Sequence, residues 1–167
     1  MITLNNSDLA RIEALAHARN DTKVGVIPTR RIDERHGDLE LNILGLKGEF
    51  AVARYLGIPI ESVDHAVSLR GRRWPHDLSY AGATIEVKTN SYPGGTLYFN
   101  EYFKADYAVL VVPGTNGAMR IVGYISRGEF HDKCNITDYG HGKRLAVVQW
   151  ALRPIEELKQ MAQGRMF

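Results

Sequence analysis

The sequence predicts an α/β layer fold in which helices cover a β-sheet. Apolar residues recur at helical spacing in two N-terminal segments, whereas the apolar run over 108–112 has the length of a buried strand. A proline at position 154 suits the first turn of a C-terminal helix. The chain has 167 residues, of which 44% are hydrophobic and 24% charged, so we expect a single globular domain with its own core.

Composition excludes several classes of protein. The Gly and Pro contents, 16 and 6 residues, argue against collagen and wholesale disorder. A single cysteine, Cys134, forms no intrachain disulfide and fits a reducing compartment. No apolar run approaches the roughly 20 residues that cross a bilayer, and the first residues lack the pattern of a secretory signal. We therefore expect a soluble, cytoplasmic protein that does not enter a membrane.

The N-terminal segment is expected to form one helix and a connector. Ser7 is a candidate N-cap, and Asn20 is a candidate stop. Residues 21–37 lack a clear period and are rich in basic side chains. We therefore interpret residues 1–37 as a helix with a basic connector, and residues 38–167 as the compact core.

A second, longer helix is expected at the start of that core. It should run to Leu56, with Asp38 as its N-cap and Gly57 past its end. Gly45 and Gly48 are poor helix formers, and we expect them to let this helix approach a sheet closely.

Most of the remaining chain is expected to form strands and turns. The segment 74–89 is predicted to be a hairpin with Ala81-Gly82 at its tip. The other expected elements are a strand over 60–69, a short helix or turn over 99–105, strands over 106–112 and 119–125, a helical turn from Ser126 or Arg127, a strand over 145–150 and a helix over 154–163.

The hairpin carries a group of residues with chemical potential. Glu86 and Lys88 are two apart on a strand, so their side chains leave the same face. A two-residue tip places Asp77 opposite Glu86, with Cβ atoms about 5 Å apart. Two carboxylates so close repel each other, and Mg²⁺ or Mn²⁺ would relieve that repulsion. The alternative is a surface hairpin whose Glu86 and Lys88 face water.

A third carboxylate comes from the preceding helix. Glu49 shares one helix face with Gly45, Val52 and Leu56. Either the fold places this acid inside for a chemical purpose, or the side chain lies at the edge of the buried face and extends to solvent. The residues alone leave both readings open.

Three motifs together resemble the PD-(D/E)xK nuclease superfamily. The motifs are the helical segment 45–57 with Glu49, the segment Pro75-His76-Asp77, and Ile85-Glu86-Val87-Lys88. The segments 105–112, 121–126 and 152–158 are similar to small phage-associated and bacterial members. One departure is His76, which separates Pro75 from Asp77.

The resemblance implies a restriction-endonuclease-like core, in which a mixed central sheet is flanked by helices. It implies a Mg²⁺-dependent endonuclease, with Mn²⁺ able to substitute, that hydrolyses phosphodiester bonds to 5′-phosphate and 3′-hydroxyl products. Asp77, Glu86 and the carbonyl of Val87 would hold the metal, with Glu49 as an additional ligand. Lys88 would position the attacking water.

The expected partner is nucleic acid, with DNA preferred over RNA on the grounds of the resemblance. The net charge of +2 is too small to indicate this partner by itself. The candidate nucleic-acid contacts are Arg70, Arg72, Arg73, Lys143 and Arg144. Two alternatives stay open. One is a junction resolvase, which would be expected to form a homodimer, and the other is a non-catalytic nucleic-acid-binding protein on the same fold.

Overall fold

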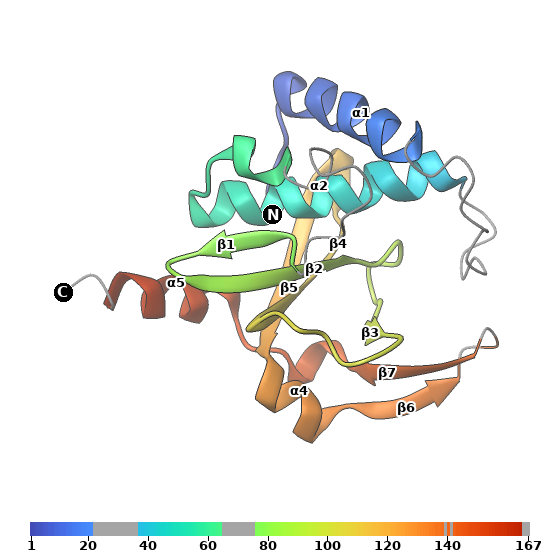
Figure 1. The fold of residues 1–167 in the computed structure, drawn as a ribbon, viewed down its shortest axis with the longest axis vertical. Coiled ribbons are helices and arrows are strands. Elements are labelled where there is room, and N and C mark those ends of the chain that lie inside the picture. Colours follow the sequence, from blue (N-terminus) through green and yellow to red (C-terminus); the bar gives the residue numbers. More distant parts are fainter. Residues whose placement is uncertain (22–36, 65–75, 139, 141, 165–167) are drawn as a thin grey trace.

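The computed structural model describes residues 1–21, 37–64, 76–138, 140 and 142–164 as an α/β arrangement of layers (Figure 1). Helix α1 lies against α2, α2 covers a four-stranded mixed sheet, and a three-stranded sheet with α4 lies on the other side. The helices are α1 (Asn6–Asp21), α2 (Asp38–Leu56), α4 (Arg127–Lys133) and α5 (Ile155–Gly164). None of these described helices is long and apolar enough to cross a membrane.

The four-stranded sheet has the order β1-β2-β4-β5, and the three-stranded sheet has the order β3-β7-β6. Strand β2 runs parallel to β4, whereas the other neighbouring pairs are antiparallel, so the larger sheet is mixed as expected. The strands are β1 (Leu78–Tyr80), β2 (Ala83–Thr89), β3 (Leu97–Phe99), β4 (Tyr107–Pro113), β5 (Met119–Ser126), β6 (Asn135–Asp138) and β7 (Lys143–Val147).

The first helix is capped by a different residue from the one expected. Asn5 Oδ1 accepts a hydrogen bond from the Asp8 amide at 2.8 Å, and Asp8 Oδ2 accepts one from the Asn5 amide at 3.2 Å. This reciprocal pair satisfies two N–H groups at the start of the helix. Ser7, predicted as the cap, lies inside α1, and the helix ends one residue beyond Asn20.

Helix α2 has the expected bounds but a different cap. Gly37 is the N-cap residue, and its amide donates to Glu40 Oε2 at 3.2 Å. Asp38, predicted as the cap, is the first helical residue, where its charge suits the helix dipole. Gly57 follows the helix in a left-handed conformation, as the sequence predicted.

Helix α2 touches the four-stranded sheet at Gly48. A Cβ atom added there would lie 1.9 Å from Thr89 Oγ1, so only glycine permits this distance between α2 and β2. Gly45 has open space around the position of a Cβ atom, so its predicted role in close approach is wrong. Gly48, and not Gly45, therefore sets the spacing between α2 and the four-stranded sheet.

The hairpin forms as predicted. Ala81 and Gly82 both have positive φ, 48° and 81°, as a two-residue primed turn requires. The turn fixes the pairing of β1 with β2, whose last pair is Leu78 with Ile85. The register deduced from the tip is therefore confirmed over all three pairs of the ladder.

Other predicted elements differ from the observed ones. Residues 60–64 form a 3₁₀ helix, η1 (Ile60–Asp64), where the sequence predicted a strand, and 65–69 lie outside the described residues. Pro59 starts this turn, because its carbonyl accepts the Ser62 amide at 3.0 Å. The segment 100–105 contains no helix, and β7 ends at Val147 before a short 3₁₀ turn, η3 (Gln149–Ala151).

The four-stranded sheet separates two hydrophobic clusters. Ile85 and Val87 of β2 pack in the cluster under α2, which also includes Ile12 of α1. Ala108 and Leu110 of β4 belong to the second cluster, on the side of the three-stranded sheet. Because side chains alternate along a strand, the even-numbered residues of β2 lie on this second side.

Candidate active site

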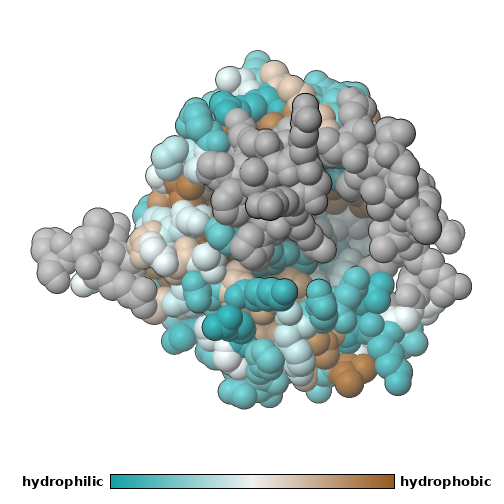
Figure 2. All heavy atoms as spheres, viewed as in Figure 1, coloured by the Kyte–Doolittle hydropathy of each residue, from teal (hydrophilic) through white to brown (hydrophobic). Residues whose placement is uncertain are grey.

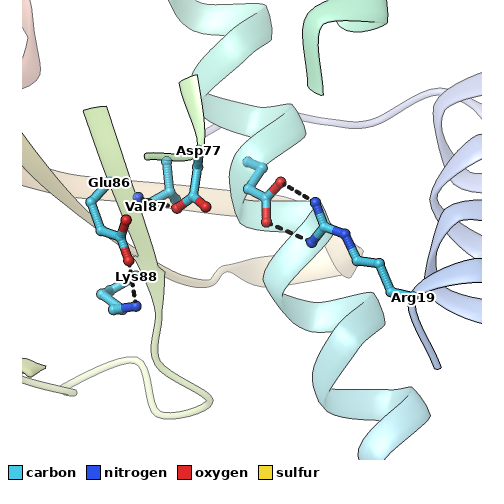
Figure 3. A network of polar contacts seen from close by, with 6 residues as sticks. Arg19, Asp77, Glu86, Val87 and Lys88 are labelled. Atoms are coloured by element: carbon cyan, nitrogen blue, oxygen red, sulfur yellow. Dashed lines mark hydrogen bonds and ion pairs between the residues drawn. The ribbon is translucent and has the colours of Figure 1, made fainter. Parts of the chain in front are cut away.

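Asp77 lies where β1 separates from β2 (Figure 3). Its amide donates to the Ile85 carbonyl at 3.0 Å, and its Oδ2 accepts the Val87 amide at 2.7 Å. A side-chain oxygen thus takes the place of the backbone acceptor that a longer β1 would supply. The carboxylate is thereby held at the edge of β2, next to the strand's own backbone.

The carbonyl of Val87 belongs to the same edge. Within a strand, the N–H and C=O of one residue point to the same neighbour. The Val87 N–H points to Asp77, so its carbonyl faces the same side, beyond the last β1–β2 pair of the described ladder. This oxygen is a candidate metal ligand, as the sequence resemblance implied.

Glu86 and Lys88 lie together on the side of β2 that faces the three-stranded sheet. Lys88 Nζ lies 2.7 Å from Glu86 Oε1 and 5.1 Å from the centroid of the Phe99 ring. The Glu86 side chain is only 16% exposed. Glu86 therefore does not lie in open water, whereas the Lys88 side chain is 35% exposed.

Glu49 is buried, and Arg19 pairs with it. The residue is 6% exposed, so of the two readings left open the buried one holds. Arg19 Nη1 and Nη2 donate to Glu49 Oε1 and Oε2, each at 2.9 Å (Figure 3). The bidentate geometry holds the carboxylate firmly and joins α1 to α2.

Arg19 is a site residue that the sequence analysis missed. It lies seven residues after Ile12 and three after Ala16, so it continues the buried stripe of α1. A cation on the apolar face of a helix requires a buried acid as its partner. The position of Arg19 on the apolar face of α1 could therefore have predicted a buried ion pair, although it does not identify Glu49 as the partner.

The three carboxylates act on one another electrostatically. Burial, which is the largest cause, and the negative charges of Glu49 and Glu86 together raise the pKa of Asp77 from 3.8 to about 8. The Val87 amide and Lys88 oppose this increase in the pKa. Asp77 therefore favours its protonated form at neutral pH, and a nearby cation would restore the carboxylate.

The donor set fits a hard divalent cation in its chemistry. Asp77, Glu86 and the Val87 carbonyl offer oxygen atoms, which Mg²⁺ and Mn²⁺ prefer. Within the described residues, no three His, Cys, Asp or Glu side chains form a group ready to hold a metal ion. Glu49 comes from the α2 side of β2 and Glu86 from the opposite side. The donors proposed for Mg²⁺ are therefore the carboxylates of Asp77 and Glu86 and the Val87 carbonyl. Water molecules would complete the coordination, because Mg²⁺ retains much of its hydration.

The structure describes only two of the candidate nucleic-acid contacts, Lys143 and Arg144. Arg70, Arg72 and Arg73 lie outside the described residues. Lys143 and Arg144 begin β7, where they pair with Asp138 and Thr137 of β6. On the face seen in Figure 2, the coloured residues are mostly hydrophilic, with hydrophobic ones among them.

Comparison with protein-family models, with curated proteins and with solved structures found no match for the chain. The resemblance to the nuclease superfamily is therefore carried by the motif residues alone.

Proposed function

We propose that this protein is a Mg²⁺-dependent nuclease with a restriction-endonuclease-like core, which hydrolyses phosphodiester bonds, preferentially in DNA. The observation that carries the proposal is the position of Asp77. Its carboxylate accepts the Val87 amide just before the first residue of β1, and the two residues that flank Val87 in β2, Glu86 and Lys88, form an ion pair. This contact between Asp77 and the backbone of the strand that carries Glu86 and Lys88 supports the proposal.

Each residue has a distinct role in the proposed reaction. Asp77, Glu86 and the Val87 carbonyl would hold the metal ion, which supplies a more acidic bound water and neutralises charge on the phosphate. Lys88, already 2.7 Å from Glu86, stabilises negative charge that develops on the phosphoryl oxygens and orients the attacking water. The products would carry a 5′-phosphate and a 3′-hydroxyl.

Glu49 and Arg19 support this centre from the other side of β2. The bidentate pair keeps the Glu49 carboxylate close enough to raise the pKa of Asp77. With both oxygens bonded to Arg19, Glu49 is better suited to contact the metal through a water than directly.

A second candidate function is a nucleic-acid-binding protein without catalysis. The Arg19–Glu49 ion pair favours this candidate. Both oxygens of Glu49 are already bonded to Arg19, whereas a catalytic centre would use this carboxylate for the metal. The two candidates differ in whether Mg²⁺ leads to cleavage.

The deciding experiment compares cleavage of labelled single-stranded, duplex and branched DNA and of RNA, in Mg²⁺, Mn²⁺ or EDTA. Lys88→Ala is expected to lower metal-dependent cleavage by at least about 100-fold while nucleic-acid binding is kept. Lys133→Ala is the matched control, because Lys133 also forms an ion pair with a glutamate, Glu129, at 3.6 Å on α4. Full activity of Lys88→Ala, or cleavage of no substrate by the wild type, contradicts the nuclease proposal.

A further inference from the structure

Trp150 has an unusual position on the surface. It is 87% exposed, the highest value among the large hydrophobic side chains described. Tryptophan normally buries most of its large apolar area. The backbone around it is ordered, since the amides of Ala151 and Leu152 donate to the carbonyls of Val148 and Gln149, each at 3.1 Å. A fixed turn therefore presents this indole to solvent.

The turn that carries Trp150 is bonded to the loop after β2. Gln149 Nε2 donates to the carbonyl oxygens of Pro93 and Gly95, at 3.0 and 2.6 Å. Tyr92, the residue before Pro93, is 53% exposed. Two exposed aromatic residues thus adjoin the same contact, one from each of the two bonded segments.

The guanidinium of Arg120 also bonds the loop after β2. Arg120 Nη2 donates to the Pro93 carbonyl at 2.6 Å, so its guanidinium lies on the loop that Gln149 also binds. We call Tyr92, Pro93, Arg120 and Trp150 the Trp150 surface. Exposed aromatic side chains and a guanidinium on segments that bond the same loop suit single-stranded nucleic acid, because the rings stack on bases and the cation attracts phosphate.

The loop that carries Tyr92 directly follows β2, the strand of the candidate active site. Tyr92 follows Lys88 by four residues, so their Cα atoms are at most about 14 Å apart. The Asn90 amide donates to the Val111 carbonyl at 2.9 Å, which fixes the start of the loop to β4. A nucleic-acid strand with a phosphate at Asp77 and Lys88 therefore has this surface within reach of its neighbouring nucleotides.

We propose that the Trp150 surface binds unpaired nucleotides of a nucleic-acid strand by base stacking. Within a duplex, the faces of the bases are covered by their neighbours, so an exposed indole selects nucleotides that are single-stranded. The link to cleavage rests on the proposed nuclease function. If that function holds, the Trp150 surface selects a substrate with a single-stranded segment next to the cleaved bond.

The first test measures binding in EDTA, so that it does not depend on cleavage. Anisotropy of a labelled oligo(dT) strand should show an affinity loss of about 10-fold for Trp150→Ala, the effect of losing one base stack. Binding to a duplex of equal length should change less than about twofold. Ile136→Ala is the matched control, because Ile136 is another exposed apolar side chain, 70% exposed on β6, and its removal should leave both affinities unchanged.

The second test uses fluorescence of the indole itself. The chain contains two tryptophans, so Trp74→Phe leaves Trp150 as the sole indole emitter. Addition of unlabelled oligo(dT) in EDTA should quench this emission as bases stack on the ring. The proposal is overturned if the emission is not quenched, or if Trp150→Ala binds oligo(dT) as tightly as the wild type. It is also overturned if sedimentation shows that Trp150→Ala loses self-association, because Trp150 would then contact a second copy of the chain. Quenching without any cleavage in Mg²⁺ supports it and contradicts only the nuclease function.

Discussion

Arg19 binds both carboxylate oxygens of Glu49, each at 2.9 Å, and so joins the last turn of α1 to the middle of α2. Removal of one member leaves a buried charge without compensation. Arg19→Ala should therefore lower the free energy of unfolding by about 3 kcal/mol, as measured by urea denaturation.

A surface ion pair provides the comparison for that measurement. Arg11 Nη1 lies 3.5 Å from Glu61 Oε1, and the Glu61 side chain is largely exposed. Arg11→Ala should cost less than about 1 kcal/mol. The double variant Arg19→Met with Glu49→Leu should recover much of the lost stability, because no buried charge remains. Equal losses for Arg11→Ala and Arg19→Ala would refute the importance of the buried pair.

The stability of the protein should depend on the charge of Asp77. The unfolded chain loses this proton near pH 3.8, whereas burial and two carboxylates raise the pKa to about 8 in the folded state. Between these values the folded state binds the additional proton, so stability falls as the pH rises, by up to about 1.4 kcal/mol per pH unit. Asp77→Asn should remove this contribution in urea denaturation carried out in EDTA at pH 5 and pH 8. Asp132→Asn, on α4, is the control, and an unchanged slope in Asp77→Asn would contradict the assignment.

Mg²⁺ should stabilise the folded protein through the same site. A ligand that binds only the folded state raises the free energy of unfolding by about 1.4 kcal/mol at ten times its Kd, which raises Tm by a few degrees for a chain of this size. Glu86→Gln should abolish the increase in thermal melts with millimolar Mg²⁺. Glu101→Gln, an exposed carboxylate before Tyr102, should keep it. If Mg²⁺ raised the Tm of the wild type, Glu86→Gln and Glu101→Gln equally, the metal would bind at another site.

The two glycines of α2 should respond in opposite ways to alanine. Gly48→Ala brings a Cβ atom within 1.9 Å of Thr89 Oγ1, so we expect a loss of about 1–3 kcal/mol. Gly45 has free space, and Gly45→Ala should stabilise the helix by up to about 1 kcal/mol. Thr89→Ala should partly rescue Gly48→Ala in chemical denaturation. A similar effect of alanine at both positions would show that the spacing of α2 and β2 is not set at Gly48.

The hairpin and the proximity of Asp77 to Glu86 could be predicted because local chemistry determines them. The Ala81-Gly82 tip fixes the register as far as the Leu78–Ile85 pair. Asp77 precedes that pair, and the charge of Glu86 raises its pKa. Strands β3 and β6 were not predicted, because β3 has three residues and β6 exposes Ile136, so neither shows a clear apolar alternation.

The partner of Glu49 could not be predicted for a different reason. Arg19 is 30 residues away in sequence, and the pair forms only when α1 docks on α2. Similarly, the contact of Gln149 with Pro93 joins segments 56 residues apart. Periodicity identifies which face of an element is buried, but it carries no information about which distant element covers that face.

The hydrogen bond from Val87 to Asp77 makes a backbone amide report on the state of the site. A carboxylate accepts this bond more strongly than a carboxylic acid does. The NMR resonance of the Val87 amide should therefore shift as Asp77 loses its proton near pH 8, and shift at lower pH once Mg²⁺ is added. One backbone amide of the protein would thus record both proton and metal occupancy of the site, without any substrate.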